Sequence, residues 1–164
     1  MLTQERLKEL FGYCPDTGVF YWTVSCNRLK PGDKAGSVSS RGYVLIKISG
    51  KYYRAHRLAW LYVYGEFPKN EIDHKDGDKT NNRIDNLREC THAQNHQNRV
   101  SMPKSSSKYT GVSWYKNSKK WRAKIVTNGV DKYLGLYESE SEAYKAYCKA
   151  KFELHEFQPQ PRDL

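Results

Sequence analysis

Residues 71–100 carry most of the side chains in this chain that could do chemistry. The segment contains, in order, Asp73, His74, Asn86, His92, Asn95, His96 and Asn98. An imidazole titrates near neutral pH, so His74 is the best candidate for a general base that takes a proton from water. The oxygens of Asp73 and Asn95 are ligands that suit a hard cation such as Mg²⁺ or Mn²⁺. We therefore predict a site in this segment that uses a divalent metal ion.

The local signals around these residues predict a strand, a loop, a second strand and a helix. Two short extended pieces, 71–74 and 87–90, flank a loop rich in turn-forming residues at 76–82. Thr91 and Gln94 form the capping box that begins a helix. This order can bring Asp73, His74 and Asn95 together. Neighbouring strand residues point to opposite faces, so the first two cooperate only if the metal and water lie at the end of the strand.

The remaining polar residues of this segment have two interpretations. His96 lies about 100° around the helix from Asn95, so both cannot point equally well at one metal. His92 precedes Asn95 by three residues and lies on a more similar face, where it could contact phosphate. The alternative for both histidines is a surface or packing role. His92, His96 and Asn98 are therefore kept as neighbours of the site.

Charge and cysteine content limit the possible function classes. The chain has 28 Lys+Arg and 18 Asp+Glu, a net charge of +10, and a pI of about 9.4. This positive charge predicts a polyanionic partner, for which nucleic acid is the first candidate. The alternative is a basic protein that has no such partner. The four cysteines are far apart, which argues against a thiolate zinc site. Without a long apolar run or an apolar N-terminal segment, we predict an intracellular protein with no membrane contact.

The N-terminal half is predicted to place a small α+β scaffold before the candidate site. A helix is expected at Thr3–Phe11, a hairpin at 13–22, a basic loop at Ser25–Ser40 and a second hairpin at 43–54. Ala55–Tyr64 is predicted to be a helix ended by Gly65. Basic residues on the second hairpin could follow a DNA backbone, or form an ordinary solvated face. They are Arg41, Lys47, Lys51 and Arg54.

A separate C-terminal domain is predicted at 109–164, after a linker at 101–108. Three strands at 109–115, 121–127 and 131–137 precede a helix that begins at Ser139 or Ser141 and continues to about Phe157. Alternation predicts that one face packs on the helix through Val112, Trp114, Trp121, Ala123, Ile125, Leu134 and Leu136. The opposite face carries Ser113, Tyr115, Arg122, Lys124 and Tyr133. A basic, aromatic sheet face can lie in the major groove, or can simply be solvated.

The residues Asp73-His74, Asn86 and Asn95 resemble the HNH nuclease motif of phage and intron-associated homing endonucleases. The segments 55–60 and 82–88 are similar to the same subfamily, and the resemblance covers roughly 13–99. It implies a ββα-metal module within a nuclease domain at 1–100, which hydrolyses phosphodiester bonds with His74 as the base. It also implies that Asn86 holds the loop and His74 in register. The last motif position is often His and is Asn95 here, which retains an oxygen donor.

From Tyr109-Thr110-Gly111-Val112 to 143–147, the chain resembles the plant ethylene-response-factor (APETALA-two type) DNA-binding domain. The resemblance implies binding to the major groove through the three-stranded sheet. Ser113, Tyr115, Arg122, Lys124 and Tyr133 fall at or beside positions that this family uses on DNA. The plant domains place arginines where this chain has Thr110, Ser113 and Tyr115, so their base preference does not carry over.

Together these features predict an α+β protein that is a metal-dependent, site-directed DNA endonuclease of homing type. Its expected partner is double-stranded DNA, with no protein partner implied. As a monomer with one site it should nick one strand, in the cytoplasm of a bacterium or a phage-infected host. The alternative is a sequence-specific DNA-binding regulator with an inactive nuclease fold. An RNA-binding role is disfavoured because the chain has no single-strand binding motif.

Overall fold

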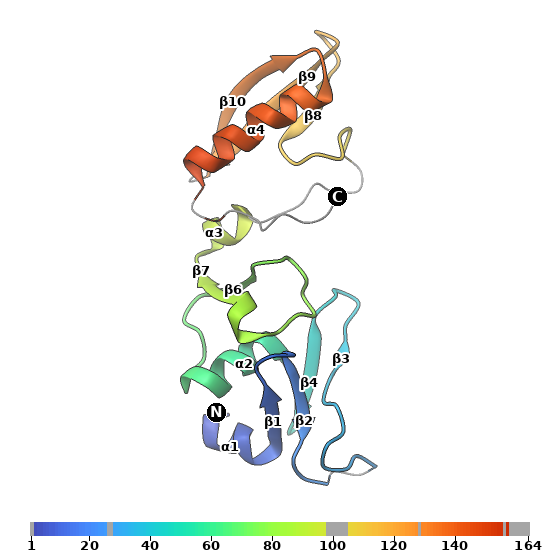
Figure 1. Ribbon diagram of the computed structural model, residues 1–164, viewed down its shortest axis with the longest axis vertical. Helices are drawn as coiled ribbons and strands as arrows, with labels where there is room; N and C mark the ends of the chain where they lie inside the picture. The colour runs from blue at the N-terminus through green and yellow to red at the C-terminus, as the bar shows by residue number, and fades with distance from the viewer. Residues whose placement is uncertain (1, 26–27, 98–104, 128, 156, 158–164) are drawn as a thin grey trace. The chain divides into compact units, whose positions relative to one another are not determined.

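The computed structural model describes residues 2–25, 28–97, 105–127, 129–155 and 157 (Figure 1). The chain forms two compact units, Met1–Cys90 and Thr91–Gln160. The linker expected at 101–108 falls partly outside the described residues, and the domain boundary drawn there stays a prediction. None of the described helices has the length and apolarity needed to cross a membrane.

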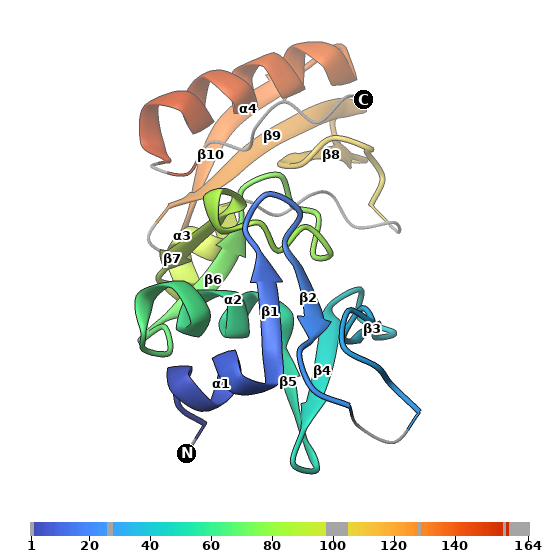
Figure 2. The ribbon, with the colours of Figure 1, turned by 60° about the horizontal axis from the view of Figure 1, so that its bottom comes forward.

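The first unit contains two helices and three small antiparallel sheets (Figure 2). Its elements are α1 (Gln4–Leu10), β1 (Phe11–Cys14), β2 (Val19–Trp22), β3 (Ser37–Val38), β4 (Val44–Ile48), β5 (Lys51–Arg54), α2 (Ala55–Tyr64), β6 (Glu71–His74), the 3₁₀ turn η1 (Ile84–Asn86) and β7 (Leu87–Cys90). The sheets are β1–β2, β3–β4–β5 and β6–β7. This arrangement confirms the predicted hairpins. The loop expected at Ser25–Ser40 contains one strand, β3, that its sequence did not indicate.

Helix ends in this unit follow their local signals. The side chain of Thr3 accepts a hydrogen bond from the amide of Arg6, which makes Thr3 the N-cap of α1. Helix α2 has the predicted bounds and ends at Gly65, whose φ of 85° is the left-handed conformation that glycine tolerates. The predicted helix at Thr3–Phe11 is one residue too long at its C-terminal end, because Phe11 already pairs with Trp22 in the first hairpin.

The core of the first unit joins both helices to the hairpins. Leu7, Phe11, Phe20, Ile46 and Leu58 are almost completely buried in one cluster. The β1–β2 hairpin is also tied to the loop after β6, since the Tyr13 hydroxyl donates to the carbonyl of Asn82 over 2.7 Å. The N-terminal hairpin therefore supports the segment that carries the candidate site.

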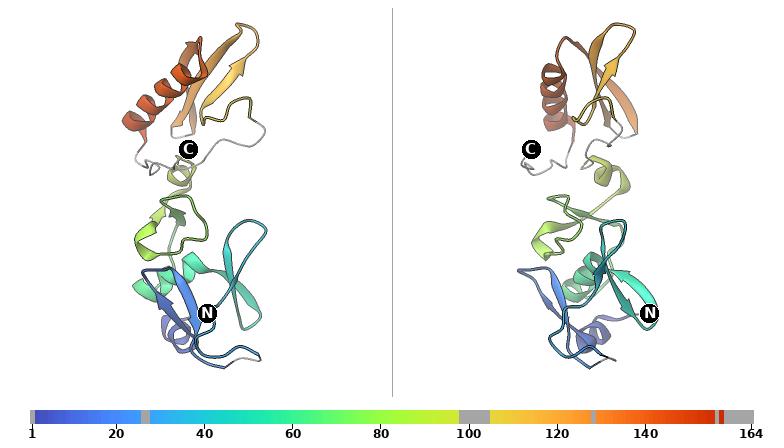
Figure 3. Two further views of the ribbon diagram at one scale, coloured as in Figure 1. Left: turned by 45° about the vertical axis from the view of Figure 1, so that its right-hand side comes forward. Right: turned by 90° about the vertical axis from the view of Figure 1, so that its right-hand side faces the viewer.

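The second unit contains a short helix and a sheet covered on one face by a long helix (Figure 3). Its elements are α3 (His92–Gln97), β8 (Val112–Tyr115), β9 (Lys120–Thr127), β10 (Val130–Tyr137) and α4 (Glu140–Leu154). Strand β9 is central, and all pairs are antiparallel. Ser139 and Glu142 form a capping box at the start of α4. The helix ends at Leu154, three residues before the predicted end. The two units together confirm the α+β class.

The predicted faces of this sheet hold except at Leu136 and, in part, at Trp114. Ala123 and Ile125 are buried against α4, as expected. A bulge at Leu134 shifts the register of β10, so Leu136 pairs with Arg122 and lies on the opposite face from the helix. Trp114 pairs with Trp121 but is 40% exposed, because β8 is the edge strand. The alternation of apolar and polar residues in the sequence did not reveal Leu134 as the extra residue of the bulge.

Candidate functional site

His74 is the last residue of β6 and is buried within the first unit. Its Nε2 lies 3.3 Å from Oδ1 of Asn82, a side chain that is itself only 2% exposed. The hairpin register pairs His74 with Leu87 and Asp73 with Arg88. Burial lowers the pKa of His74, although the hydrogen bond with Asn82 and the nearby Asp76 oppose that shift. The net lowering favours the neutral imidazole, which is the form that a general base requires.

A second histidine, His56, contacts the first. It lies in the first turn of α2 and is 3% exposed. The rings of His56 and His74 meet edge to face, with 5.0 Å between their centroids. Burial is the main reason that the pKa of His56 is lowered to about 3. His56 lies in the segment 55–60 that resembles the homing-endonuclease subfamily, and no role was predicted for it. The sequence signal for such a role was a histidine among the apolar residues of α2.

Asn86 closes the loop between β6 and β7. Its Oδ1 accepts from the amide of Asp76 at 3.1 Å, and its Nδ2 donates to Oδ1 of Asp76 at 3.0 Å and to the carbonyl of Asn81 at 2.9 Å. The amide of Lys75 also donates to the carbonyl of Asn86. These bonds fix the residues that follow His74. They fit the holding role predicted for Asn86, and its part in catalysis stays a prediction.

Asp73 is buried beside an arginine. The Nε and Nη2 atoms of Arg88 both donate to Oδ2 of Asp73, at 2.9 and 2.7 Å. A second arginine, Arg57, supports the start of β6 from α2, because its guanidinium donates to the carbonyls of Pro68 and Asn70. Neither arginine had a predicted role. Cross-strand pairing of residues 73 and 88 would have been the signal for the ion pair.

The predicted metal ligands have suitable chemistry for a hard cation. Asp73 supplies a carboxylate in the first unit, and Asn95 supplies an amide oxygen on α3 in the second. No three His, Cys, Asp or Glu side chains gather as a metal site within the part of the chain that is described. Carboxylate and amide oxygens each suit Mg²⁺ or Mn²⁺, which keep several waters and take phosphate oxygens as further ligands.

Helix α3 begins as its sequence predicts. The amide of Thr91 donates to Oε1 of Gln94, and the amide of Gln94 donates to Oγ1 of Thr91, completing the capping box. Asn95 is half-buried and His92 is exposed. The side chain of His96 and the whole of Asn98 lie outside the described residues.

The predicted DNA-binding residues of the second unit share one sheet face. Ser113 pairs with Arg122 and Lys124 with Tyr133, and Tyr115 follows Ser113 by two residues. The guanidinium of Arg122 lies 5.5 Å from the ring of Tyr115 and donates to Oγ of Ser113 at 3.4 Å. Lys124 forms an ion pair with Asp131 at 2.8 Å. The face opposite α4 is therefore aromatic and basic, with Lys124 partly neutralised.

The predicted basic residues of the first unit, Arg41, Lys47 and Arg54, are exposed. Lys47 and Arg54 share a face of the β4–β5 hairpin, since Lys47 pairs with Tyr52 and Leu45 pairs with Arg54. The amine of Lys47 lies 5.5 Å from the ring of Tyr52. Arg41 precedes β4 in the connecting turn. Their exposure permits contact with a polyanion.

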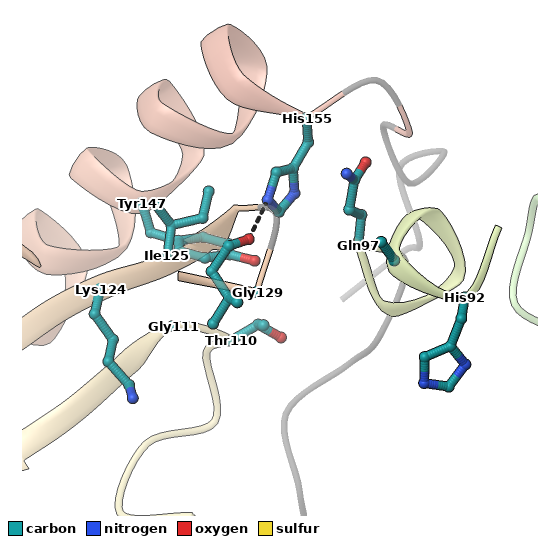
Figure 4. A pocket seen from close by; sticks show the side chains of 11 residues that line it. His92, Gln97, Thr110, Gly111, Lys124, Ile125, Gly129, Tyr147 and His155 are labelled. Atoms are coloured by element: carbon teal, nitrogen blue, oxygen red, sulfur yellow. Dashed lines mark hydrogen bonds between the residues drawn. The ribbon is translucent and has the colours of Figure 1, made fainter. Parts of the chain in front are cut away.

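A cavity of about 490 Å³ lies within the second unit, between α3 and the sheet (Figure 4). Gln97, Ile125 and Tyr147 line it, together with His155, which contacts the carbonyl of Val126 through Nε2 at 2.9 Å. Among the described lining residues, Lys124 was predicted to bind DNA, and His92 was kept as a neighbour of the site that could contact phosphate. The cavity brings together no other residue of the predicted site.

Comparison with known proteins supports both halves of the sequence interpretation. Residues 53–97 match the family model of an HNH endonuclease, and residues 107–156 match that of the AP2 domain. Protein 3.8 of Escherichia phage T7 is 34% identical over 77 residues, which are 46% of this chain and 64% of that protein. The chain therefore spans slightly less than two thirds of this relative.

This chain is also similar to a chain in a solved structure titled "DNA binding and cleavage by the HNH homing endonuclease I-HmuI". Its sequence identity is 23% and its TM-score is 0.42, with 82% of this chain and 75% of that chain covered. The family matches support a role as a DNA endonuclease or a DNA-binding protein. This chain carries an HNH endonuclease segment followed by an AP2 domain.

Proposed function

We propose that this protein is a metal-dependent endonuclease that hydrolyses phosphodiester bonds in duplex DNA at a selected site. The observation that carries the proposal is the environment of His74. It is a buried histidine with a lowered pKa, beside a carboxylate, inside the segment that matches the HNH endonuclease family. A buried neutral imidazole next to an oxygen ligand suits metal-assisted attack by water on phosphate.

In the proposed mechanism, His74 accepts a proton from the attacking water. Asp73 and Asn95 would hold the divalent cation, which polarises the phosphate and stabilises the leaving 3′ oxygen when it is bound. Asn86 keeps the loop after His74 in place through its bonds to Asp76 and Asn81. One such site serves one strand, so a monomer nicks duplex DNA.

The AP2 domain is proposed to anchor the protein on DNA. Arg122, Lys124 and Tyr133 would face the major groove together with Ser113 and Tyr115, while Arg41, Lys47 and Arg54 contact backbone phosphates. Phosphate contacts supply salt-dependent affinity, and base-edge contacts select the site. Two joined binding modules also raise the effective concentration of the nuclease at its target.

A second candidate function is a DNA-binding regulator whose nuclease segment is inactive. The ion pair between Asp73 and Arg88 is the observation that favours it, because Arg88 occupies one oxygen of a predicted metal ligand. Under this alternative the ion pair would persist in the DNA complex, and the segment would serve only as a scaffold.

A nicking assay on supercoiled plasmid with Mg²⁺ or Mn²⁺ separates these functions. We expect wild type to nick, His74→Ala to lose nicking while retaining its DNA affinity, and EDTA to abolish activity. His92→Ala removes an exposed imidazole outside the buried pair, so we expect this variant to keep nicking; if His92 contacts phosphate, it should only weaken DNA binding. Tight DNA binding by wild type without cleavage of any DNA, under either metal, would favour the regulator.

A further inference from the structure

Two cations from different elements converge on the ring of Tyr43. The guanidinium carbon of Arg54, at the end of β5, lies 4.8 Å from the ring centroid. The amine of Lys79, in the loop after β6, lies 4.9 Å from the same centroid. Arg54 and Lys79 are exposed, and Tyr43 is half-buried. Cation–π contacts of this kind hold both charged groups near one aromatic ring.

The position of Lys79 is fixed by the turn before β4. Its amine donates to the carbonyl of Arg41 at 3.2 Å. A Cβ placed on Gly42 would lie 3.7 Å from Cδ of Lys79, which puts the lysine stem alongside this turn. The turn is itself held by Ser39, whose Oγ accepts from the amide of Tyr43 and whose amide donates to the carbonyl of Tyr43. A contact with the backbone of this turn thus holds Lys79 beside Tyr43.

This pair of cations has no acidic ion-pair partner among the described residues. Across the residues that the structure describes, neither Arg54 nor Lys79 takes part in an ion pair, whereas Lys120, Lys124 and Arg88 each have one. Two positive charges, each within about 5 Å of the centroid of one ring, repel each other, and an anion that contacts both would offset that repulsion. Guanidinium and ammonium groups together are a common arrangement for binding a phosphate oxygen.

Tyr43 also connects this pair to the candidate site. Its ring centroid lies 5.4 Å from that of His56 and 6.3 Å from that of His74. An anion held by Arg54 and Lys79 would therefore lie near the histidine pair. Successive phosphates of one DNA strand lie close together, so such an anion can be a neighbour of the scissile phosphate.

We propose that Arg54, Lys79 and Tyr43 form a clamp for one non-scissile phosphate of the strand that is cut, beside the phosphate on which His74 acts. This assignment rests on the proposed nuclease function. Arg54 and Lys79 grip the phosphate, and Tyr43 sets the spacing between them and the histidine pair. The clamp fixes the register of the DNA strand at the site.

The test uses the full chain and a labelled mixed-sequence duplex in EDTA, so that binding is measured without cleavage. We expect Arg54→Gln and Lys79→Gln each to weaken binding and to lower the slope of log affinity against log salt by about one. Because both residues bind one phosphate, the double variant should lose little more than either single variant. Lys69→Gln, an exposed residue of the first unit to which no DNA contact is assigned, is the control and should lack this coupling with Lys79→Gln.

Plasmid nicking at saturating protein adds a second measurement. If the clamp sets strand register, the single clamp variants should nick at least about tenfold more slowly, a loss of about 1.4 kcal/mol of transition-state stabilisation. Lys69→Gln should nick at the wild-type rate. Additive losses in binding, or unchanged nicking in both variants, would overturn the clamp. Failure of wild type to nick, with the binding coupling intact, would instead count against the nuclease function.

Discussion

The ring of His56 meets the ring of His74 edge to face at an interplanar angle of 89°. Both side chains are more than nine-tenths buried, and burial lowers the pKa of each. Each ring also disfavours a positive charge on the other. The pair is therefore kept neutral at physiological pH, which retains His74 in the form that accepts a proton.

Burial of His56 predicts loss of stability in acid. Its pKa is about 3 in the folded protein, below its ordinary value of 6.5. The unfolded chain therefore binds more protons between these two pH values, so stability is complete above pH of about 6.5 and falls as the pH drops towards 3. Each pH unit in that window removes up to about 1.4 kcal/mol. Urea unfolding of the first unit, followed by tryptophan fluorescence at several pH values, measures the loss.

A His56→Phe variant provides the control for this pH dependence. It keeps a ring of similar size but removes the titrating group, so the variant should lose less stability than wild type between neutral pH and pH 4. His74 also has a lowered pKa and contributes in the same direction, so some dependence will remain. Identical pH profiles for wild type and His56→Phe would contradict the assignment to His56.

The hydrogen bonds of Asn86 lead us to predict that Asn86→Ala and Asn86→Asp differ in how their loss of stability depends on pH. Asn86→Ala removes the bonds to Asp76 and Asn81 and should cost about 1–3 kcal/mol. Asn86→Asp keeps the shape but replaces the Nδ2 donor with an oxygen that faces the carboxylate of Asp76. It should therefore destabilise at least as much at pH 7 and recover part of that loss when the pH is lowered. Urea unfolding at pH 7 and pH 4 tests this; equal losses at both pH values in Asn86→Asp would contradict it.

The close packing of Gly18 against the backbone of Asn82 and Arg83 leads us to predict that the N-terminal hairpin directly supports the loop of the candidate site. Its φ is 70°, and a Cβ there would lie 2.4 Å from the amide nitrogen of Arg83 and 2.5 Å from the carbonyl carbon of Asn82. Gly18→Ala should cost about 1 kcal/mol for the left-handed backbone and about 1–3 kcal/mol for the clash. Gly50→Ala is the matched control, since Gly50 has a φ of 82° but no atom within 4 Å of such a Cβ. Equal losses of stability in the two variants would exclude a contribution from the contact with Asn82.

Local signals accounted for the elements that were predicted correctly. Helix α2 and the capping boxes of α3 and α4 depend on residues within one or two turns of each other. The bulge at Leu134 could not be predicted in this way. Its position depends on pairing with β9, and a one-residue insertion reverses the faces of the residues that follow.

The candidate site was predicted in its residue types but not in its contacts. His74 and Asn86 were selected by their chemistry and by resemblance. Their partners come from other elements, such as His56 from α2 and Tyr43 from the turn before β4. Arginine is common in a basic chain, so the sequence did not distinguish Arg88, which pairs with Asp73, from its solvated neighbours. Only tertiary packing selects these partners.

The C-terminal end of α3 depends on a buried lysine of α4. Nζ of Lys151 donates to the carbonyl of Gln97, the last residue of α3, at 2.7 Å, although Lys151 is only 7% exposed. The amide of Phe157 donates to Oε1 of the same glutamine at 3.1 Å. The last carbonyls of a helix have no partner within the helix, and a cation there also favours the helix dipole. We therefore expect Lys151→Met to loosen α3, including the turn that contains Asn95.

Amide hydrogen exchange at 92–97 in the full chain measures this effect. In Lys151→Met the exchange should become faster by roughly fivefold to thirtyfold, which corresponds to about 1–2 kcal/mol of lost local stability. Lys149→Met is the control, because Lys149 is an exposed residue of the same helix. Protection of the α4 amides shows whether the second unit remains folded in each variant. Equal exchange of α3 in the two variants, with α4 protected in both, would mean that Lys151 does not hold this helix.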